Sequence, residues 1–398
     1  MKKHILFLSG GLKIGGVERV LIEYLNNIDR EKYKITLFLM SDFGKEAVLR
    51  DELNEEIEVK YIKPLELLEE KKKLQQNKKN IFRKLKYSKF LKNEKKYSYK
   101  NFSKNLAEIS KVDIIIDFDR SFMKYTKYMR NIPKFIWIHS SVIELDKCKE
   151  INIKKFDRYL RNYNKIVAIC SEMSEEIRDL YPLLSKKLAV LYNPFDFDRI
   201  IKKSFDRNEL NNDEKKMMND NYLIAVSRIE KISKDIPTLI NAYNILQKNG
   251  LTEKLYIIGD GDEKLEIERM IKEMKLEESV YLLGAKKNPF IWIKNSKLFV
   301  HSSKFEGLST VLIEAMILEK LIVSSLCKTG VKEILDNGNC GLFFEVGNET
   351  EFAEQMIKIL NDEELQNKFK ENMKEKVKEF KKENIITKFC ELLESIWE

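Results

Sequence analysis

The stretch LFVHSSKFEGLSTVLIEAM, residues 298–316, indicates the fold class more clearly than any other part of this sequence. It begins with apolar residues typical of a buried strand and ends in an apolar helical pattern. Between them lie Gly307, Ser309 and Thr310, residue types that favour turns and helix N-caps, so we expect a helix to begin near Ser309. A strand that passes through a short loop into a helix is typical of parallel α/β domains.

Two carboxylates, Glu306 and Glu314, stand eight residues apart in this stretch. The first turn of the expected helix presents free backbone N–H groups and the positive end of the helix dipole, which together suit a phosphate. Glu306 would lie on the loop that faces the same crevice. Glu314 would lie about one and a half turns into the helix, where it can accept hydrogen bonds from hydroxyls. Phosphate and hydroxyls together indicate a nucleotide sugar; the alternative is an amphipathic helix with two surface glutamates.

The composition is that of a globular protein with two domains. The chain has 398 residues, of which 43% are apolar, and this is enough for two cores of ordinary size. No apolar run approaches the roughly 18 residues of a membrane span. The first apolar run is short and ends in glycines, so we expect a strand there and not a signal peptide. Five scattered cysteines favour a reducing cytoplasm and predict neither disulfides nor a zinc site.

Apolar segments of strand length alternate with helical patterns along the chain, which predicts parallel α/β domains. Residues 208–221 are polar and carry no strand pattern, so a boundary is expected near them. We predict an N-terminal domain of residues 1–193, a C-terminal domain of residues 194–382, and a final amphipathic helix at residues 383–398. The expected strands are residues 4–9, 35–40, 58–62, 114–117, 134–138, 165–169, 188–191, 222–227, 254–258, 280–283, 297–300 and 321–325.

The net charge of +9 is concentrated in one region. Between Lys71 and Lys104 stand fourteen Lys or Arg residues and one acid, interleaved with apolar and aromatic side chains. More cations follow without acids, at Arg120, Lys124, Lys127, Arg130 and Lys134. Cations mixed with apolar residues predict contact with an anionic membrane surface. Nucleic acid is the rival partner, which we do not expect, and a solvated Lys-rich helix is the alternative without a partner.

Two further loops carry residues that suit a diphosphate. One follows the first strand and contains Gly15 and Gly16 among four glycines in seven positions. Glycines allow the backbone to approach a diphosphate closely at a helix N-terminus. The other follows residues 222–227 and contains Arg228, with Lys231 and Lys234 beyond it. Arg would make a forked contact and Lys a point contact with the departing diphosphate, whose charge they would stabilise.

No metal site is expected. The sequence has three Asp-x-Asp pairs, at residues 117–119, 196–198 and 260–262, a pattern that can hold a divalent cation. Three copies at unrelated turns indicate chance in a chain rich in acids. We therefore expect neither a metal nor another cofactor.

The order of these motifs resembles that of the retaining glycosyltransferases of family 4, which have the GT-B fold. The spacing of Glu306 and Glu314, the cations that begin at Arg228, and the turn containing Gly259 carry the resemblance, which is strong over residues 222–345 and absent from residues 71–104. Ser227 departs from the glycine usual in the family. The resemblance implies two Rossmann-like domains that face each other across a cleft, with the last helix crossing back to the N-terminal domain.

The resemblance also implies roles for single residues. Glu306 would contact the transferred sugar and Glu314 the ribose. Arg228 and Lys234 would neutralise the diphosphate; Lys231 stays an alternative, and Lys234 is preferred because residues 235–240 match the helix that follows in the family. The donor would further contact Gly15, Gly16, Gly259, Gly307, Ser309 and Thr310. His139 corresponds to a histidine close to the donor sugar, whereas His4 and His301 are expected to be structural.

The expected function is retaining, metal-independent transfer of a hexose or N-acetylhexosamine from a UDP-sugar to a glycan or lipid-linked acceptor. Bacterial surface polysaccharide synthesis on the cytoplasmic face of the membrane is the expected setting. One alternative is a sugar-nucleotide epimerase of the same fold, but such enzymes carry additional acids and histidines in the cleft. Another is a non-catalytic partner subunit, which would be expected to lose a motif residue, although all four of Arg228, Lys234, Glu306 and Glu314 are present.

Overall fold

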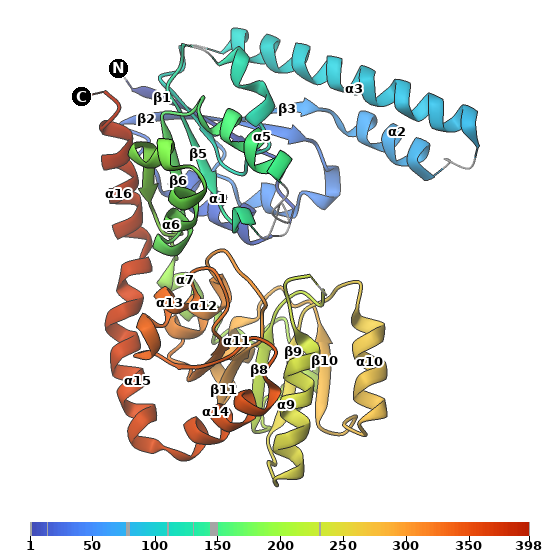
Figure 1. The fold of residues 1–398 in the computed structure, drawn as a ribbon, viewed down its shortest axis with the longest axis vertical. Helices are drawn as coiled ribbons and strands as arrows, with labels where there is room; N and C mark the ends of the chain where they lie inside the picture. Colours follow the sequence, from blue (N-terminus) through green and yellow to red (C-terminus); the bar gives the residue numbers. More distant parts are fainter. Residues whose placement is uncertain are drawn as a thin grey trace.

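The structure is a computed structural model of the chain, and it describes residues 2–13, 15–76, 80–109, 111–129, 131–143, 150–230 and 232–397. Lys231, the alternative to Lys234, lies outside the described residues. The chain folds into two α/β domains, one above the other in Figure 1, with both termini at the upper domain. This arrangement confirms the fold class expected from the alternating strands and helices.

The first domain contains a parallel sheet with the strand order β3-β2-β1-β4-β5-β6-β7. Alternate residues of β1 enter two different cores: Ile5 and Phe7 one, Leu6 and Leu8 the other. Both faces of the sheet are therefore covered, as is typical of parallel sheets. The strands are β1 Lys3–Ser9, β2 Tyr33–Ser41, β3 Glu58–Lys63, β4 Ile114–Asp117, β5 Lys134–Ile138, β6 Lys165–Ala168 and β7 Leu188–Val190. The helices α1 Gly16–Asn27, α5 Glu150–Leu160 and α6 Ser171–Leu180 belong to the same domain.

The second domain contains a parallel sheet with the strand order β10-β9-β8-β11-β12-β13. Helices α7 Phe197–Lys203 and α8 Asn212–Met217 lie in the segment between the two sheets. The strands are β8 Tyr222–Val226, β9 Lys254–Ile258, β10 Val280–Gly284, β11 Leu298–His301, β12 Ile322–Ser325 and β13 Leu342–Phe344. The helices are α9 Ile236–Lys248, α10 Lys264–Glu273, α11 Phe290–Asn295, α12 Thr310–Ile317, α13 Val331–Ile334 and α14 Glu349–Asn361. The sequence analysis missed the three-residue strand β13.

Helices α15 Glu363–Lys376 and α16 Lys382–Glu394 run along one side of the molecule and join the two domains (Figure 1). The buried ring of Phe389 on α16 packs against Phe7, Tyr24 and Trp137 of the first domain, with ring centroids 5.1 to 6.3 Å apart. Where the chain crosses back, Lys382 N donates to Phe195 O at 3.0 Å. The expected return of the last helix is therefore confirmed.

The basic region forms an arm that projects from the first domain (Figure 1). It consists of α2 Leu65–Gln76 and the long helix α3 Ile81–Glu108. Near the end of α3 the buried ring of Phe102 packs edge-on against Phe38, whereas Phe82 at its start is 79% exposed. Among the described residues, no helix combines the length and apolarity needed to span a bilayer.

Candidate active site

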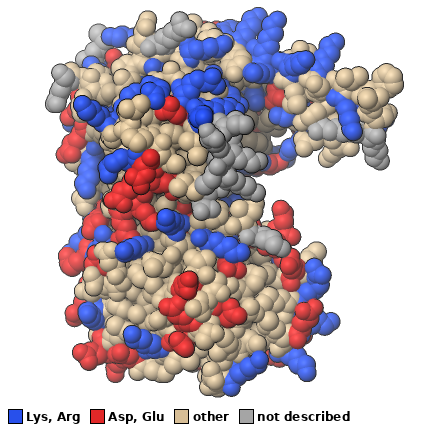
Figure 2. Space-filling view, viewed as in Figure 1, with Lys and Arg blue, Asp and Glu red and all other residues tan. Residues whose placement is uncertain are grey.

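Figure 2 shows a hollow between the two domains, and the candidate site lies where the two domains meet. The residues after β5 in the first domain and after β11 in the second approach each other there. A Cβ atom on Gly307 would lie only 2.0 Å from the backbone oxygen of His139, so the two loops are in backbone contact. Ligands of open α/β sheets bind outside the carboxyl ends of the strands, which is where both loops are found.

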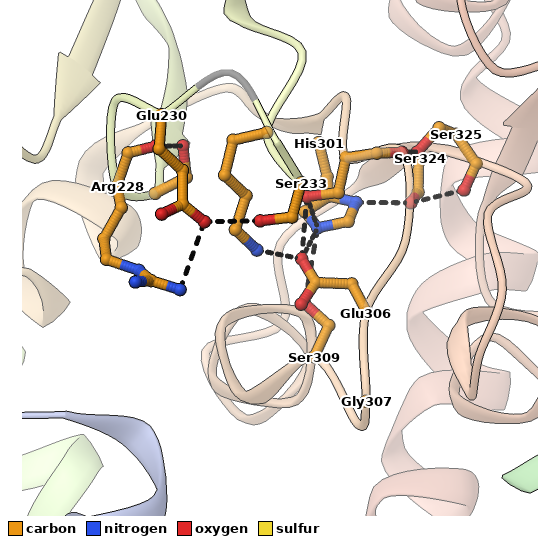
Figure 3. A network of polar contacts seen from close by, with 12 residues as sticks. Arg228, Glu230, Ser233, His301, Glu306, Gly307, Ser309, Ser324 and Ser325 are labelled. Carbon is orange, nitrogen blue, oxygen red and sulfur yellow. Dashed lines mark hydrogen bonds and ion pairs between the residues drawn. The ribbon is translucent and has the colours of Figure 1, made fainter. Parts of the chain in front are cut away.

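Glu306 lies at the centre of a cluster of polar side chains (Figure 3). Its Oε1 atom accepts hydrogen bonds from the Lys234 ammonium and from Ser303 Oγ, the latter at 2.7 Å. The same oxygen lies 3.0 Å from His301 Nε2, while His301 Nδ1 lies 2.9 Å from Ser324 Oγ. His301 is the last residue of β11, and the loop that follows bends back so that the Glu306 carboxylate contacts the His301 ring.

The charges in this cluster compensate one another. Burial alone would raise the pKa of Glu306, but the Lys234 ammonium and the hydrogen bond from His301 outweigh it and hold that pKa well below its usual range. Burial lowers the pKa of His301, which opposes its protonation. Glu306 is therefore an anion, and the Lys234 ammonium, whose side chain is 14% exposed, is its cation.

The loop that carries Glu306 leads into α12 as the sequence predicted. Ser309 is the N-cap residue and Thr310 is the first helical residue. The Ser309 side chain makes no capping hydrogen bond, so the N–H groups of the first turn stay available to an anion. The hydroxyl of Thr329 donates to the backbone oxygens of Glu306 and Gly307, both at 3.0 Å, and this fixes the loop.

Arg228 and Gly259 lie on adjacent loops after β8 and β9. The Arg228 side chain is 74% exposed, and its guanidinium pairs with Glu230 at 3.2 Å. Gly259 has φ +147°, and a Cβ atom there would lie 1.8 Å from the backbone oxygen of Ser227. Glycine is therefore required for the close packing of these two loops, and its contact with a donor stays a prediction.

Glu314 lies in the middle of α12 and is half-buried. Burial raises its pKa to about 7, and the opposing effects of Arg199 and Arg19 are smaller. Among the described residues, no side chain donates a hydrogen bond to its carboxylate. Glu314 is thus free to accept hydrogen bonds from a ligand, as expected for a contact with ribose hydroxyls.

The first domain contributes uncharged groups to the opposite wall of the hollow. His139 follows β5, and its Nε2 atom lies 2.7 Å from the backbone oxygen of Phe118. Burial lowers the pKa of His139 to about 4, so the imidazole is neutral at physiological pH. A nitrogen bonded to a backbone oxygen must carry the proton, which leaves Nδ1 as an acceptor for a hydroxyl.

The glycine loop after β1 is anchored by Asp119. Its Oδ2 atom accepts hydrogen bonds from Ser9 Oγ at 2.9 Å and from the amide of Gly10 at 2.6 Å. Gly15 is the N-cap residue of α1, and a Cβ atom on Gly16, the first helical residue, would meet nothing within 4 Å. The open side of Gly16 is compatible with the predicted diphosphate contact.

The structure thus brings Glu306, Lys234, Gly307 and Ser309 together with His139, whereas Glu314, Arg228 and the glycine loops surround them without direct contact. The sequence analysis treated His301 as structural and so missed its contact with Glu306. Glu333 on α13, which the turn of residues 330–334 also makes a site candidate from the sequence, accepts hydrogen bonds on its carboxylate from the Ser171 amide at 2.8 Å and from the Tyr192 hydroxyl. Glu333 therefore links the two domains. In the described part of the chain, no group of three or more His, Cys, Asp or Glu side chains forms a metal site.

Solved structures of similar fold include HepE of Anabaena in complex with UDP and glucose, with a TM-score of 0.75 at 19% identity. That comparison covers 98% of this chain and 99% of HepE. TarM of Staphylococcus aureus matches with a TM-score of 0.71 at 14% identity, over 98% of this chain and 99% of TarM. Both neighbours are glycosyltransferases with the GT-B fold, and the chain shares this fold.

Two curated relatives illustrate the sequence similarity. An N-acetylgalactosaminyltransferase of Campylobacter jejuni, whose name specifies a diphospho-undecaprenol-linked acceptor, is 32% identical over 53% of this chain and 54% of the relative. A poly(ribitol-phosphate) α-N-acetylglucosaminyltransferase of Staphylococcus aureus is 27% identical over 61% of this chain and 47% of the relative. The matches therefore span about half the length of these relatives.

Two family models match consecutive parts of the chain. The model described as Glycosyltransferase Family 4 matches residues 14–199, and the model described as Glycosyl transferases group 1 matches residues 206–376. The first match covers most of the upper domain and the second most of the lower one. The chain therefore belongs to the glycosyltransferases of group 1 and family 4, with the GT-B fold.

Proposed function

We propose that the chain is a retaining glycosyltransferase that transfers a hexose or N-acetylhexosamine from a UDP-sugar to a lipid-linked glycan acceptor. The observation that carries this proposal is the Glu306 carboxylate, held by Lys234 and His301 beside the free N-terminus of α12. The similar proteins add support, since the name of one specifies a diphospho-undecaprenol-linked acceptor and HepE was crystallised with UDP-glucose.

In this proposal the second domain holds the donor. The first-turn amides of α12, Arg228 and Lys234 bind the diphosphate, and Glu314 accepts hydrogen bonds from the ribose. Lys234 already donates to Glu306, but an ammonium has three N–H groups, so two can still reach a phosphate. The two cations supply the charge that a divalent metal supplies elsewhere, and the transfer is therefore proposed to need no metal.

The reaction follows from these contacts. The bond between the sugar C1 and the β-phosphate oxygen breaks, and UDP leaves with the electron pair towards the cations and the helix N-terminus. The acceptor hydroxyl attacks C1 from the same face, and its proton passes to the departing phosphate oxygen. Glu306 orients the sugar, and neutral His139 accepts a hydrogen bond from a sugar hydroxyl.

The arm is proposed to bring the enzyme to the inner face of the cytoplasmic membrane, where a lipid-linked acceptor is found. Ile81, Phe82 and Leu85 at the start of α3 are 69%, 79% and 62% exposed, an unusual arrangement for neighbouring apolar side chains in water. Lys and Arg gather over the upper domain and its arm in Figure 2. Exposed apolar residues among cations suit the interface of an anionic membrane.

The test is UDP release by the purified chain, supplied with UDP-, GDP- and ADP-sugars, with and without a bacterial lipid extract, and with EDTA present. We expect release from one UDP-sugar, dependent on the extract and unaffected by EDTA. Glu306→Gln should lower kcat by about 10²- to 10³-fold, the usual loss for a group that stabilises the transition state. The exposed Glu277→Gln variant on the same domain is the matched control and should keep full activity.

Two results would contradict the proposal. Inversion at C1, read by NMR of the product, would exclude same-face attack. Binding of a nucleotide sugar without release under any of these conditions would favour a non-catalytic partner subunit.

A further inference from the structure

A second cationic pocket lies in the first domain, away from the hollow between the domains. The cavity has a volume of about 420 Å³ and is lined by Lys124, Lys127, Lys134 and Arg158, together with Tyr159 and Asn162. Lys134 is at the start of β5, whereas His139 follows the end of the same strand. The pocket therefore lies at the opposite edge of the sheet from the candidate active site and takes no part in its chemistry.

The cations of this pocket have no counter-charge in the described part of the chain. No carboxylate lines the cavity, and none of the four cations forms an ion pair with a described residue. Lys134 is only 5% exposed, yet its ammonium donates no hydrogen bond to any described side chain or backbone oxygen. Burial and the neighbouring Lys187 lower the pKa of Lys134, so its charge is held at a cost. Of the four, Lys134 is buried, whereas Lys124, Lys127 and Arg158 are exposed. A buried charge in a native protein is normally paired, and an anion in the cavity would pair Lys134 and be attracted by the three exposed cations.

The surroundings of the pocket favour a membrane as the source of the anion. The Lys127 ammonium lies 5.1 Å from the ring of Tyr99 on α3 and 4.7 Å from the ring of Tyr128, so the rim of the pocket adjoins the base of the arm. Tyrosines with lysines are typical of the interfacial region of a bilayer. The same arm carries the exposed apolar residues Ile81, Phe82 and Leu85.

We propose that this pocket binds the phosphate group of an anionic phospholipid headgroup. Free inorganic phosphate has the same chemistry and is the competing source, which the experiment separates. The inference rests on the proposed membrane association but not on the proposed sugar transfer. The arm supplies apolar contact with any bilayer, and the pocket adds selectivity for anionic lipid.

The first experiment is flotation of the full chain with phosphatidylcholine vesicles, with and without phosphatidylglycerol. Lys124→Glu/Arg158→Glu reverses two exposed cations at the rim, and Lys248→Glu/Lys272→Glu makes the same charge change on the second domain. At about fivefold per cation, the rim variant should bind phosphatidylglycerol vesicles at least ~25-fold more weakly than the unaltered chain. The control should lose less than about threefold, because its charges are remote and screened. Binding to pure phosphatidylcholine should not change.

The second experiment uses Lys134→Met and inorganic phosphate. In phosphate-free buffer the variant should melt at a higher temperature than the unaltered chain, because an unpaired buried charge is removed. Phosphate should raise the melting temperature of the unaltered chain by more than that of the variant, because the proposed diphosphate site is present in both proteins. A Lys134→Met variant that melts lower in both buffers would overturn the pocket as an anion site.

The outcomes of the two experiments distinguish a lipid headgroup from free phosphate as the source of the anion. Equal losses in the rim variant and its control would overturn a specific site and leave only a diffuse basic surface. A phosphate response without any loss of vesicle binding would overturn the lipid assignment in favour of free phosphate. UDP release measured on a lipid-free acceptor reports the sugar transfer separately, so failure there leaves this inference intact.

Discussion

The two walls of the candidate active site present different kinds of polar group. On the wall of the second domain, Glu306, Lys234 and His301 are held together by direct polar contacts, and their charges compensate in a buried setting. On the wall of the first domain, His139 has a pKa lowered to about 4 and contacts a backbone oxygen, while the glycine loop offers backbone groups. We call the first the ionic wall and the second the neutral wall after its imidazole, although the Asp119 carboxylate anchors the glycine loop there.

The difference between the walls indicates which part of a nucleotide sugar each wall suits. A nucleotide diphosphate carries charge, and its departure develops more, so it belongs beside fixed cations and a helix N-terminus. The donor sugar carries hydroxyls, for which a neutral imidazole is an adequate partner, and the backbone of the glycine loop can approach the diphosphate closely. Two properties can be tested: whether the stability of the ionic wall depends on its ion pair, and whether that of the neutral wall depends on an uncharged His139.

The largest effect is expected from breaking the ion pair of the ionic wall. Lys234→Met leaves the Glu306 carboxylate buried without a cation, and removal of one partner from a buried pair costs about 3–5 kcal/mol of unfolding free energy. The double variant Lys234→Met/Glu306→Gln should recover part of that loss, because no unpaired charge remains. Urea unfolding of the three proteins measures both effects.

A surface pair provides the control for this experiment. Lys297 pairs with Glu253 at 2.7 Å, but the Lys297 side chain is 42% exposed. Lys297→Met should therefore cost no more than about 1 kcal/mol. If Lys234→Met costs as little as Lys297→Met, the ionic wall is not held by its pair.

The next effect is a pH dependence of stability from the neutral wall. The pKa of His139 is about 4 in the folded chain and about 6.5 when unfolded, so the unfolded state binds the proton first as the pH falls. The neutral state of His139 contributes about 3 kcal/mol to the free energy of unfolding. This contribution is fully present above about pH 6.5 and is lost by about pH 4. Between about pH 7.5 and about pH 5, the unaltered chain should lose ~2 kcal/mol more stability than His139→Gln. Parallel pH profiles of the two proteins would contradict the neutral state of His139.

A smaller effect is expected where the two walls touch. In Gly307→Ala the new Cβ would lie 2.0 Å from the backbone oxygen of His139, so the walls must separate. A misplacement of about 1 Å at a reacting centre costs roughly 10²-fold in rate, and kcat should fall accordingly. Small-angle scattering should show a larger radius of gyration for Gly307→Ala than for the unaltered chain.

A second glycine substitution controls for loss of stability alone. Gly250→Ala is also destabilising, because Gly250 has φ +89°, but this glycine lies in the turn after α9. It should lower stability by about 1 kcal/mol and leave kcat unchanged. Equal kcat values for the two variants would mean that the approach of the loops does not matter.

The sequence predicted the ionic wall better than the neutral one, for physical reasons. Glu306, Ser309 and Thr310 belong to one continuous strand–loop–helix segment, so their arrangement follows from local rules. The contact of His301 with Glu306 depends on how the loop returns to the strand end, and no spacing rule reports that. The turn before α13 indicates Glu333, but its link with Ser171 joins two domains, and no local pattern reports that partner.

Two features of the fold that the sequence does not display clearly, strand β13 and the course of helix α3, have physical explanations. Strand β13 has three residues, too few to display a periodic pattern. Helix α3 is long, but its first residues, Ile81–Lys86, are exposed whether they are apolar or charged, so the apolar residues there do not mark a buried face. The basic composition of the arm was visible in the sequence, whereas its projection from the domain was not.

The smallest effect concerns Glu314, a carboxylate of the ionic wall to which no cation of the described residues is bonded. Its pKa of about 7 means that it becomes ionised as the pH rises through the physiological range. A hydrogen bond to a charged acceptor is worth about 1 kcal/mol more than one to a neutral acceptor, so affinity for a UDP-sugar should rise about fivefold between about pH 6 and about pH 8. Titration calorimetry measures this directly.

Two variants decide whether Glu314 causes that dependence. Glu314→Gln cannot ionise, so its affinity for the UDP-sugar should be low and constant over the same range. Glu319→Gln removes a nearby carboxylate that is half exposed and pairs only distantly with Lys374, at 3.9 Å. It should keep the full pH dependence. The ligand is a UDP-sugar because its phosphates, unlike the terminal phosphate of UDP, do not titrate near neutral pH. If affinity is independent of pH in the unaltered chain, Glu314 does not contact the ribose, and the donor is held by the cations and the helix N-terminus alone.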